Sequence, residues 1–169
     1  MRPHHWLKSA FVLAPLVFSG QFLELTAITD AAIAFALFSV AASATYVWND
    51  LQDIHQDRLH PVKRYTRPLA AGAVSPTSAW VLLGVLLAIL VAGAWLQPFV
   101  VGIIGVYLAI NAASSLPITE VAVVDIFAVS SGFVLRVFAG AIAIGVAVSA
   151  WMLVTTLCVA LYLTANKRR

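Results

Sequence analysis

The chain has 169 residues, of which 62% are hydrophobic and 10% are charged, and its formal net charge is +3. A water-soluble globule of this length needs far more polar surface, so the composition excludes a soluble protein and favours a membrane protein. The basic residues lie beside apolar runs and form no domain of their own, so membrane topology explains them better than a nucleic-acid partner. Cys158 is the only cysteine, which excludes an internal disulfide and a cysteine-based metal site.

The chain consists of successive apolar runs, and most of them have about the length of 20 residues that a helix needs to cross a bilayer. They predict an all-α fold, a multi-span transmembrane bundle of about six helices in one domain over residues 1–169. The expected spans cover residues 9–23, 31–48, 76–96, 99–113, 121–144 and 149–165. The first run is short and contains Pro15, so a re-entrant segment is the alternative there. The second span has Leu25 as an alternative start.

The connections between these spans carry boundary signals. Ser75 and Pro76 predict a helix start, with the serine as N-cap and the proline at the first helical position. Gln97 and Pro98 predict a tight turn between the third and fourth spans. Residues 114–120 are predicted to form a loop before the fifth span.

The basic residues indicate which side faces the cytoplasm. With six spans, both termini and the loops after the second and fourth spans lie on one side, and every basic residue except Arg136 falls there. These residues are Arg2, Lys8, Arg58, Lys63, Arg64, Arg67, Lys167, Arg168 and Arg169. The positive-inside rule therefore predicts a multi-pass protein of the plasma membrane with both termini and the polar loops in the cytoplasm.

A cluster of acidic and amide side chains comes directly after the second span. It consists of Asn49, Asp50, Asp53 and Asp57. Their spacing follows the three- and four-residue steps of a helix, so on a helix the four side chains share one face. Carboxylates this close repel one another unless a cation neutralises them, and we predict a Mg²⁺ site that also binds the phosphate of a phosphorylated or diphosphorylated substrate. The alternative is a charge run that only solvates a loop.

A basic stretch, residues 60–68, follows the acidic cluster. Its Lys63, Arg64 and Arg67 are predicted to bind phosphate oxygens, which guanidinium groups contact in a two-pronged geometry. A metal ion beside such cations suits a diphosphate leaving group at a membrane surface. For the basic stretch alone, solvation of a cytoplasmic loop explains the charges equally well.

Two ionisable residues lie in the fifth span, where charges are costly in lipid and often functional. Asp125 and Arg136 lie about 16 Å apart along a helix and cannot pair directly. Asp125 has two equal interpretations, a metal ligand or a helix cap. Arg136 is expected to face the bundle interior as an anion or carboxylate partner rather than to snorkel. Gly132 and Gly140 flank it at four residues on either side, which predicts close helix packing.

Several of these motifs resemble one known family. Residues 49–57, followed by RPLAAG at residues 67–72, look like the first aspartate-rich motif of the UbiA superfamily of intramembrane prenyltransferases. Within it, RPHHWLK at 2–8, HPVKR at 60–64, GFVLRVFAG at 132–140 and ANKRR at 165–169 look most like the decaprenyl-phosphate phosphoribosyltransferase branch. Ser114 and Thr119 depart from that branch, where Tyr and Lys are expected.

The resemblance implies a Mg²⁺-dependent transfer in which polyprenyl phosphate attacks phosphoribosyl diphosphate and diphosphate leaves, a step that feeds arabinan cell-wall biosynthesis. It also implies roles for single residues. The metal would be held by Asn49, Asp50, Asp53 and Asp57, and the three aspartates among them would be catalytic residues. Substrate phosphate would be bound by Lys63, Arg64, Arg67 and Arg136. A typical member has about nine spans and a second acidic motif in its later half, so this chain is expected to correspond to the N-terminal two thirds of the fold.

Three other functions stay open. A prenyltransferase that alkylates an aromatic or quinone precursor would use the same metal motif. A non-catalytic membrane protein is the alternative from another class, either an inactive truncated form or a scaffold that pairs with a second chain. A transporter is compatible with the composition, but the acidic cluster is predicted at the membrane surface and not near the midplane, where transporter sites lie.

Overall fold

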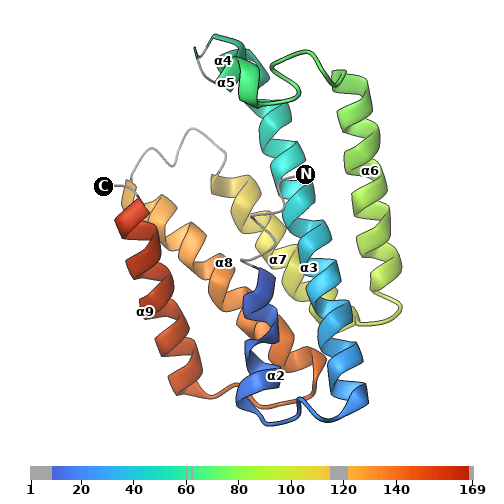
Figure 1. The fold of residues 1–169 in the computed structure, drawn as a ribbon, viewed down its shortest axis with the longest axis vertical. Helices are drawn as coiled ribbons and strands as arrows, with labels where there is room; N and C mark the ends of the chain where they lie inside the picture. The colour runs from blue at the N-terminus through green and yellow to red at the C-terminus, as the bar shows by residue number, and fades with distance from the viewer. Residues whose placement is uncertain (1–8, 60, 62, 115–121, 168–169) are drawn as a thin grey trace.

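In the computed structural model, which describes residues 9–59, 61, 63–114 and 122–167, all the regular structure of these residues is helical. The elements are η2 (Ala10–Leu13), α2 (Ala14–Phe18), α3 (Leu25–Gln52), α4 (Ile54–Leu59), α5 (Lys63–Thr66), α6 (Pro76–Gly93), α7 (Pro98–Ser114), α8 (Ala122–Ala143) and α9 (Ala150–Lys167). The five long helices run side by side along the long axis of the molecule (Figure 1), which confirms the expected all-α bundle.

The long helices have the apolar composition of membrane spans. Leu25–Gln52, Pro76–Gly93 and Ile126–Ala143 are long and apolar enough to cross a bilayer, and Pro98–Ser114 and Ala150–Asn166 are apolar but shorter. Large apolar side chains such as Val81, Phe127 and Trp151 are exposed on the outside of the bundle, where water would disfavour them and lipid would not. The chain is therefore a multi-pass membrane protein.

The expected helix boundaries agree closely with the structure. The ends of α6, α7, α8 and α9 lie within three residues of those predicted. Helix α3 begins at the alternative start, Leu25, and ends at Gln52, four residues beyond the predicted end. The predicted cap of α6 is confirmed, because the Ser75 hydroxyl accepts a hydrogen bond from the Ser78 N–H at 3.1 Å and Pro76 is the first helical residue. The predicted loop at 114–120 lies, except for Ser114, outside the described residues.

The helix in the first expected span, residues 9–23, is shorter than predicted in the described part of the chain. A 3-10 turn, Ala10–Leu13, leads into the short helix α2, which ends at Phe18. Pro15 lies in the first turn of α2, where its missing N–H costs no hydrogen bond, whereas the interior of a long helix would lose one there. Gly20 then turns the chain with φ +74°, a conformation that other residues rarely adopt.

The core lies where η2, α3, α7 and α8 meet. Its buried side chains include Val12, Phe38 and Ile104 together with small residues such as Ala34 and Ala139. Small side chains let helices approach closely, and van der Waals packing of this kind holds helices together in lipid. The core therefore packs the middle of α3, around Phe38, against α7 and α8.

The predicted close packing along the glycines of α8 is confirmed. A Cβ atom at Gly140 would collide with the backbone carbonyl of Val12, so η2 can only reach its place because position 140 has no side chain. A Cβ atom at Gly132 would lie 3.3 Å from the Tyr107 ring on α7. Both glycines thus set the distance between α8 and its neighbours.

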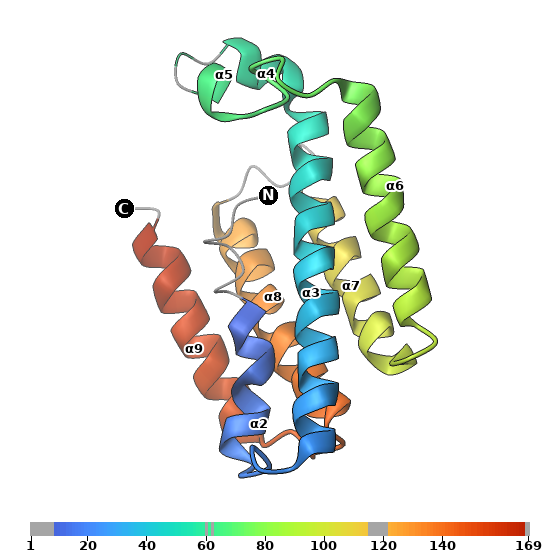
Figure 2. The same cartoon turned by 45° about the vertical axis from the view of Figure 1, so that its right-hand side comes forward.

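One end of the bundle is polar. Helices α3 and α6 extend beyond α7, α8 and α9 at this end, and α4 and α5 lie across the tip of α3 before the chain returns into α6 (Figure 2). The acidic cluster and the basic stretch belong to α4, α5 and the residues on either side of them. The candidate site therefore lies at the C-terminal end of α3, the longest helix.

Candidate functional site

The acidic cluster lies at a bend between α3 and α4. Asp53 follows the last residue of α3 with φ −85° and ψ 1°, and the chain re-enters helix at Ile54. Helical hydrogen bonds continue on both sides, from the Asp53 N–H to the Asn49 carbonyl and from the Asp57 N–H to the Asp53 carbonyl, each at 2.9 Å. The chain thus changes direction at Asp53, and these two hydrogen bonds connect the bend to the helices on either side of it.

This bend corrects the prediction that the four side chains share the face of one unbroken helix. In a straight helix, Asp50 and Asp57 would stand about 10.5 Å apart along the axis, too far for their carboxylates to meet at one point. The structure brings them together, because both carboxylates contact the same guanidinium nitrogen. The predicted convergence is present, and its cause is the bend.

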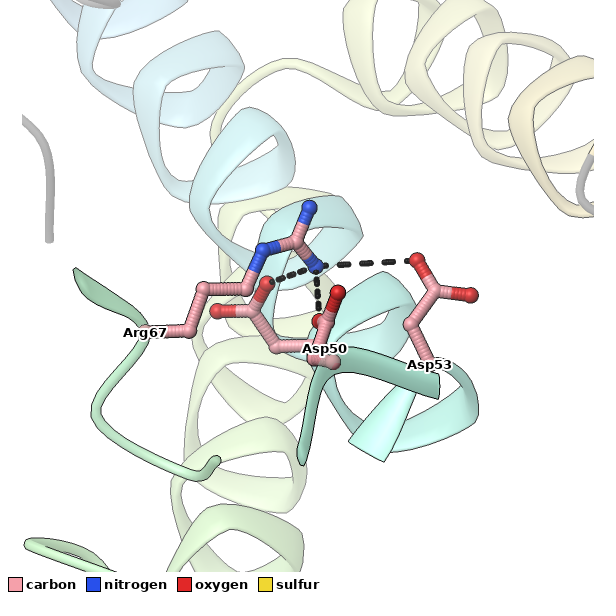
Figure 3. A network of polar contacts seen from close by, with 4 residues as sticks. Asp50, Asp53 and Arg67 are labelled. Atoms are coloured by element: carbon pink, nitrogen blue, oxygen red, sulfur yellow. Dashed lines mark hydrogen bonds and ion pairs between the residues drawn. The ribbon is translucent and has the colours of Figure 1, made fainter. Parts of the chain in front are cut away.

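The group at the centre of the cluster is Arg67 (Figure 3). Its Nη1 atom donates a hydrogen bond to Asp50 Oδ1 at 2.9 Å, and it lies 2.7 Å from Asp57 Oδ2 and 3.6 Å from Asp53 Oδ2. The short contact to Asp57 is an ion pair without hydrogen-bond alignment. Because the Asp57 side chain is only 2% exposed, its charge depends on a nearby cation.

A compact turn after α5 positions Arg67. The Ala71 N–H donates to the Arg67 carbonyl at 2.9 Å and the Ala73 N–H donates to the Pro68 carbonyl at 3.0 Å. Gly72 closes the turn with φ +74°, and the Leu69 side chain is buried. Proline, glycine and a buried leucine therefore hold the backbone of Arg67 over the end of α3.

The donor set suits Mg²⁺ even though its geometry is not that of a finished metal site. Among the described residues, no group of three or more His, Cys, Asp and Glu side chains has the arrangement needed to hold a metal ion. Magnesium commonly takes only one or two carboxylates and completes its octahedron with water and phosphate oxygens. The carboxylates of Asp50, Asp53 and Asp57 already point at one position, and a positive charge occupies it.

The other predicted site residues differ in what the structure says of them. Asn49 belongs to the last turns of α3, beside Asp50. Lys63 and Arg64 begin α5, close in sequence to Arg67, but their side chains lie outside the described part. The side chain of Asp125, near the start of α8, is also outside it.

Arg136 lies in a different environment, deep in the bundle. It is 5% exposed, and its guanidinium donates to the Gly132 carbonyl at 2.8 Å and to the Tyr107 hydroxyl at 3.2 Å. The rings of Tyr107, Phe133 and Phe38 surround it with centroids 5.0, 5.6 and 5.5 Å from Cζ. The expected interior position of Arg136 is confirmed. Its contacts among the described residues are a carbonyl, a phenol and aromatic rings, and not the carboxylate that was expected.

Arg136 and the acidic cluster are therefore separate. Phe38, which touches Arg136, precedes Asp50 on α3 by twelve residues, a rise of about 18 Å. The prediction that Arg136 binds phosphate remains a prediction. Its Nε atom is buried without a hydrogen-bond partner among the described residues.

Sequence reasoning missed two roles at these sites. It treated Arg67 only as a phosphate ligand, although the same reasoning required a cation to neutralise the carboxylates and Arg67 was the cation at hand. It also did not predict that Phe38 and Tyr107 contact Arg136. The signal for these two was an arginine in mid-span, which requires acceptors and aromatic faces from neighbouring helices.

The fold and the site define a helical membrane protein with a cluster of carboxylates around a guanidinium at one end of its longest helix. Residues 10–166 match the UbiA prenyltransferase family, and the chain belongs to this family.

Curated relatives agree with this assignment. The chain is 39% identical to the decaprenyl-phosphate phosphoribosyltransferase of Mycolicibacterium smegmatis, over 99% of this chain and 54% of that protein. The protein of the same name from Corynebacterium glutamicum is 36% identical over 99% of this chain and 52% of its own length. The nodulation protein NoeC of Azorhizobium caulinodans is 32% identical over 99% and 54%. The chain spans about half the length of these relatives.

Proposed function

We propose that this protein takes part in a Mg²⁺-dependent transfer of phosphoribose from phosphoribosyl diphosphate to a polyprenyl phosphate such as decaprenyl phosphate. A phosphate oxygen of the lipid would form a bond to C1 of the ribose, while the bond from C1 to the diphosphate breaks and diphosphate leaves with the electron pair. The observation that carries the proposal is the convergence of Asp50, Asp53 and Asp57 on one cation position. The names of the relatives support the choice of substrates.

In this proposal the residues at the end of α3 divide into two groups. Asn49, Asp50, Asp53 and Asp57 hold the metal, and Lys63, Arg64 and Arg67 bind phosphate oxygens. The bound metal ion neutralises charge that develops on the leaving oxygens. The cations of the basic stretch orient the diphosphate so that its bond to C1 is exposed to the lipid phosphate. Arg136 contributes from the core, where it fixes the packing of the helices below the site.

The lipid part of the proposed substrate is supported by a hollow next to the cluster. A cavity of about 310 Å³ opens between α3, α6 and α7, and its lining is almost entirely apolar. Trp48, directly before Asn49, and Trp80 form part of its wall with ring centroids 6.0 Å apart. An isoprenoid segment suits such a cavity, because it offers dispersion contacts and needs no hydrogen bonds.

We further propose that the site faces the cytoplasm from the plasma membrane, with both termini on the cytoplasmic side. The described basic residues of the polar end, Arg58 and Arg67, support this orientation through the positive-inside rule. Phosphoribosyl diphosphate is a charged, water-soluble compound, so a site at the water interface is also the accessible one.

The test uses membranes that contain the protein as its gene encodes it. With Mg²⁺, labelled phosphoribosyl diphosphate and polyprenyl phosphate, a labelled lipid should form, and chelation of the metal should abolish it. Asp53→Asn should lower the rate by about 100-fold, because a metal and phosphate site loses one ligand. Asp30→Asn is the matched control, since Asp30 lies near the opposite end of α3.

A second candidate is alkylation of an aromatic or quinone precursor by a prenyl diphosphate, which the name of the family favours. The same membranes distinguish it. Transfer to an aromatic acid with no lipid-linked ribose would replace the first candidate by the second. The absence of both products would leave a non-catalytic membrane protein, either an inactive form or a scaffold for a second chain.

A further inference from the structure

The position on which the three carboxylates converge is occupied by a side chain of the protein itself. Arg67 Nη1 lies 2.9 Å from Asp50, 2.7 Å from Asp57 and 3.6 Å from Asp53 (Figure 3). The oxygens that contact Arg67 are the ones that a divalent cation would need. A metal ion and the Nη1 group cannot share this position, because both require direct contact with the same carboxylate atoms.

We propose that Arg67 is a placeholder cation, which keeps the acidic cluster assembled before the metal binds and leaves it when metal and diphosphate arrive. This inference rests on the proposed function of the site. In the metal-free protein, Arg67 neutralises the buried Asp57 and holds the bend at Asp53 in shape. When a divalent cation takes the carboxylates, the guanidinium moves to the diphosphate oxygens, with which it forms two parallel hydrogen bonds.

The exposures of the three acids indicate the order of exchange. The Asp53 side chain is 47% exposed and has the longest contact with Arg67, whereas the Asp57 side chain is 2% exposed and has the shortest. An incoming ion therefore meets Asp53 first, from the solvent side. Asp57 stays paired with Arg67 until a second positive charge is close, so its charge is compensated throughout.

The position of Arg67 in the chain permits this movement. Its backbone is held in the turn at Pro68, and four side-chain torsions separate that backbone from the guanidinium. The Arg67 side chain as a whole is 20% exposed, so part of it is in contact with the solvent from which a diphosphate would approach. Only the side chain has to move, and α3, α4 and α5 can stay in place.

The experiment measures Mn²⁺ binding, as a paramagnetic substitute for Mg²⁺, to purified protein with and without inorganic diphosphate. Removal of a competitor should strengthen binding of the metal alone. Arg67→Gln should therefore bind Mn²⁺ about tenfold more tightly than the natural protein, if the placeholder occupies the position about nine tenths of the time. Diphosphate should strengthen Mn²⁺ binding in the natural protein. The gain should be much smaller in Arg67→Gln, because this variant lacks the guanidinium that would bind the diphosphate oxygens.

Arg58→Gln is the matched control, because it removes one positive charge from the neighbouring helix α4 and has an exposed side chain. It should leave Mn²⁺ affinity within about twofold of the natural value, since solvent and salt screen the charge of an exposed side chain. If both variants strengthen Mn²⁺ binding equally, a general loss of positive charge explains the effect and the inference is overturned.

Thermal unfolding gives a second measurement if Arg67→Gln is poorly stable. That variant should unfold at a lower temperature without metal, and Mn²⁺ should raise its midpoint by more than it raises that of the natural protein. Weaker or unchanged Mn²⁺ binding in Arg67→Gln, with no such gain in stability, would overturn the inference and make Arg67 a supporting group. Failure of the proposed function is a separate result, in which Arg67→Gln binds Mn²⁺ tightly but no membrane forms product.

Discussion

Arg136 places a guanidinium group inside an apolar bundle, and its neighbours explain how it is tolerated. Each of its described polar contacts comes from a different element or turn, with Tyr107 on α7 and the Gly132 carbonyl one turn earlier on α8. The surrounding rings attract the cation through their negative faces. A lysine could not replace it, because a single ammonium group lacks the planar geometry for two separate acceptors and three rings.

Removal of the Tyr107 hydroxyl should show how much this arrangement depends on a single acceptor. Tyr107→Phe leaves a buried guanidinium N–H unpaired and should destabilise the protein by about 1–2 kcal/mol in thermal unfolding in detergent. The loss should vanish in the background of Arg136→Met, because no donor then needs the hydroxyl. Tyr162→Phe, on the exposed side of α9, is the control and should change nothing. An unchanged stability of Tyr107→Phe would show that the hydrogen bond has no energetic role.

The acidic residues illustrate what sequence can predict for single side chains. The residue types and their spacing placed Asp50, Asp53 and Asp57 on one helix face, and the structure brings their carboxylates to one guanidinium through the bend at Asp53. They did not indicate Arg67 as the partner, since it follows Asp50 by seventeen residues and only the turn at Pro68 brings it back. Contacts between distant positions depend on loop geometry, which local patterns do not encode.

Among the helices, prediction succeeded where composition alone decides the outcome. Long apolar runs form helices in lipid because every backbone group must be paired within the segment. This constraint placed α6, α7, α8 and α9 within a few residues of their observed bounds. It was less accurate for residues 9–23, where the observed helix ends at Phe18 and η2 packs closely against α8 at Gly140.

The contact between η2 and α8 supplies a test of helix packing. Gly140→Ala should separate the two elements, because the new Cβ atom would collide with the Val12 carbonyl, and should destabilise the protein by about 1–3 kcal/mol. Gly105→Ala on α7 is the matched control, since a Cβ atom there meets nothing within 4 Å. It should be neutral or slightly stabilising in thermal unfolding, because alanine favours helix by about 1 kcal/mol. Equal stabilities of the two variants would contradict the packing described for Gly140.

The molecule as a whole is polarised, with the acidic cluster at one end of the bundle and the link between α8 and α9 at the other (Figure 1). The two ends must face opposite sides of the membrane if the long helices cross it. The proposed orientation places α4 in the cytoplasm, and this can be measured without knowledge of the substrate.

Cysteine labelling tests the orientation, because Cys158 is the only native cysteine and can be replaced by serine. In that background, Leu59→Cys on α4 should react with a membrane-impermeant maleimide only after the cells are permeabilised. Ala147→Cys, in the link between α8 and α9, should react in intact cells, because both side chains are exposed. The opposite pattern would place the acidic cluster outside the cell and remove its access to cytoplasmic diphosphates.

By itself, the sequence determined that this is a helical membrane protein, where most of its helices begin and end, and which charged residues lie together after the second span. It could do so because hydropathy, helix caps and the three- and four-residue steps are local properties. Only the tertiary structure decided that the chain bends at Asp53, that Arg67 occupies the centre of the cluster and that three aromatic rings lie around Arg136. Each of these depends on contacts between segments far apart in the chain, whose positions follow from packing.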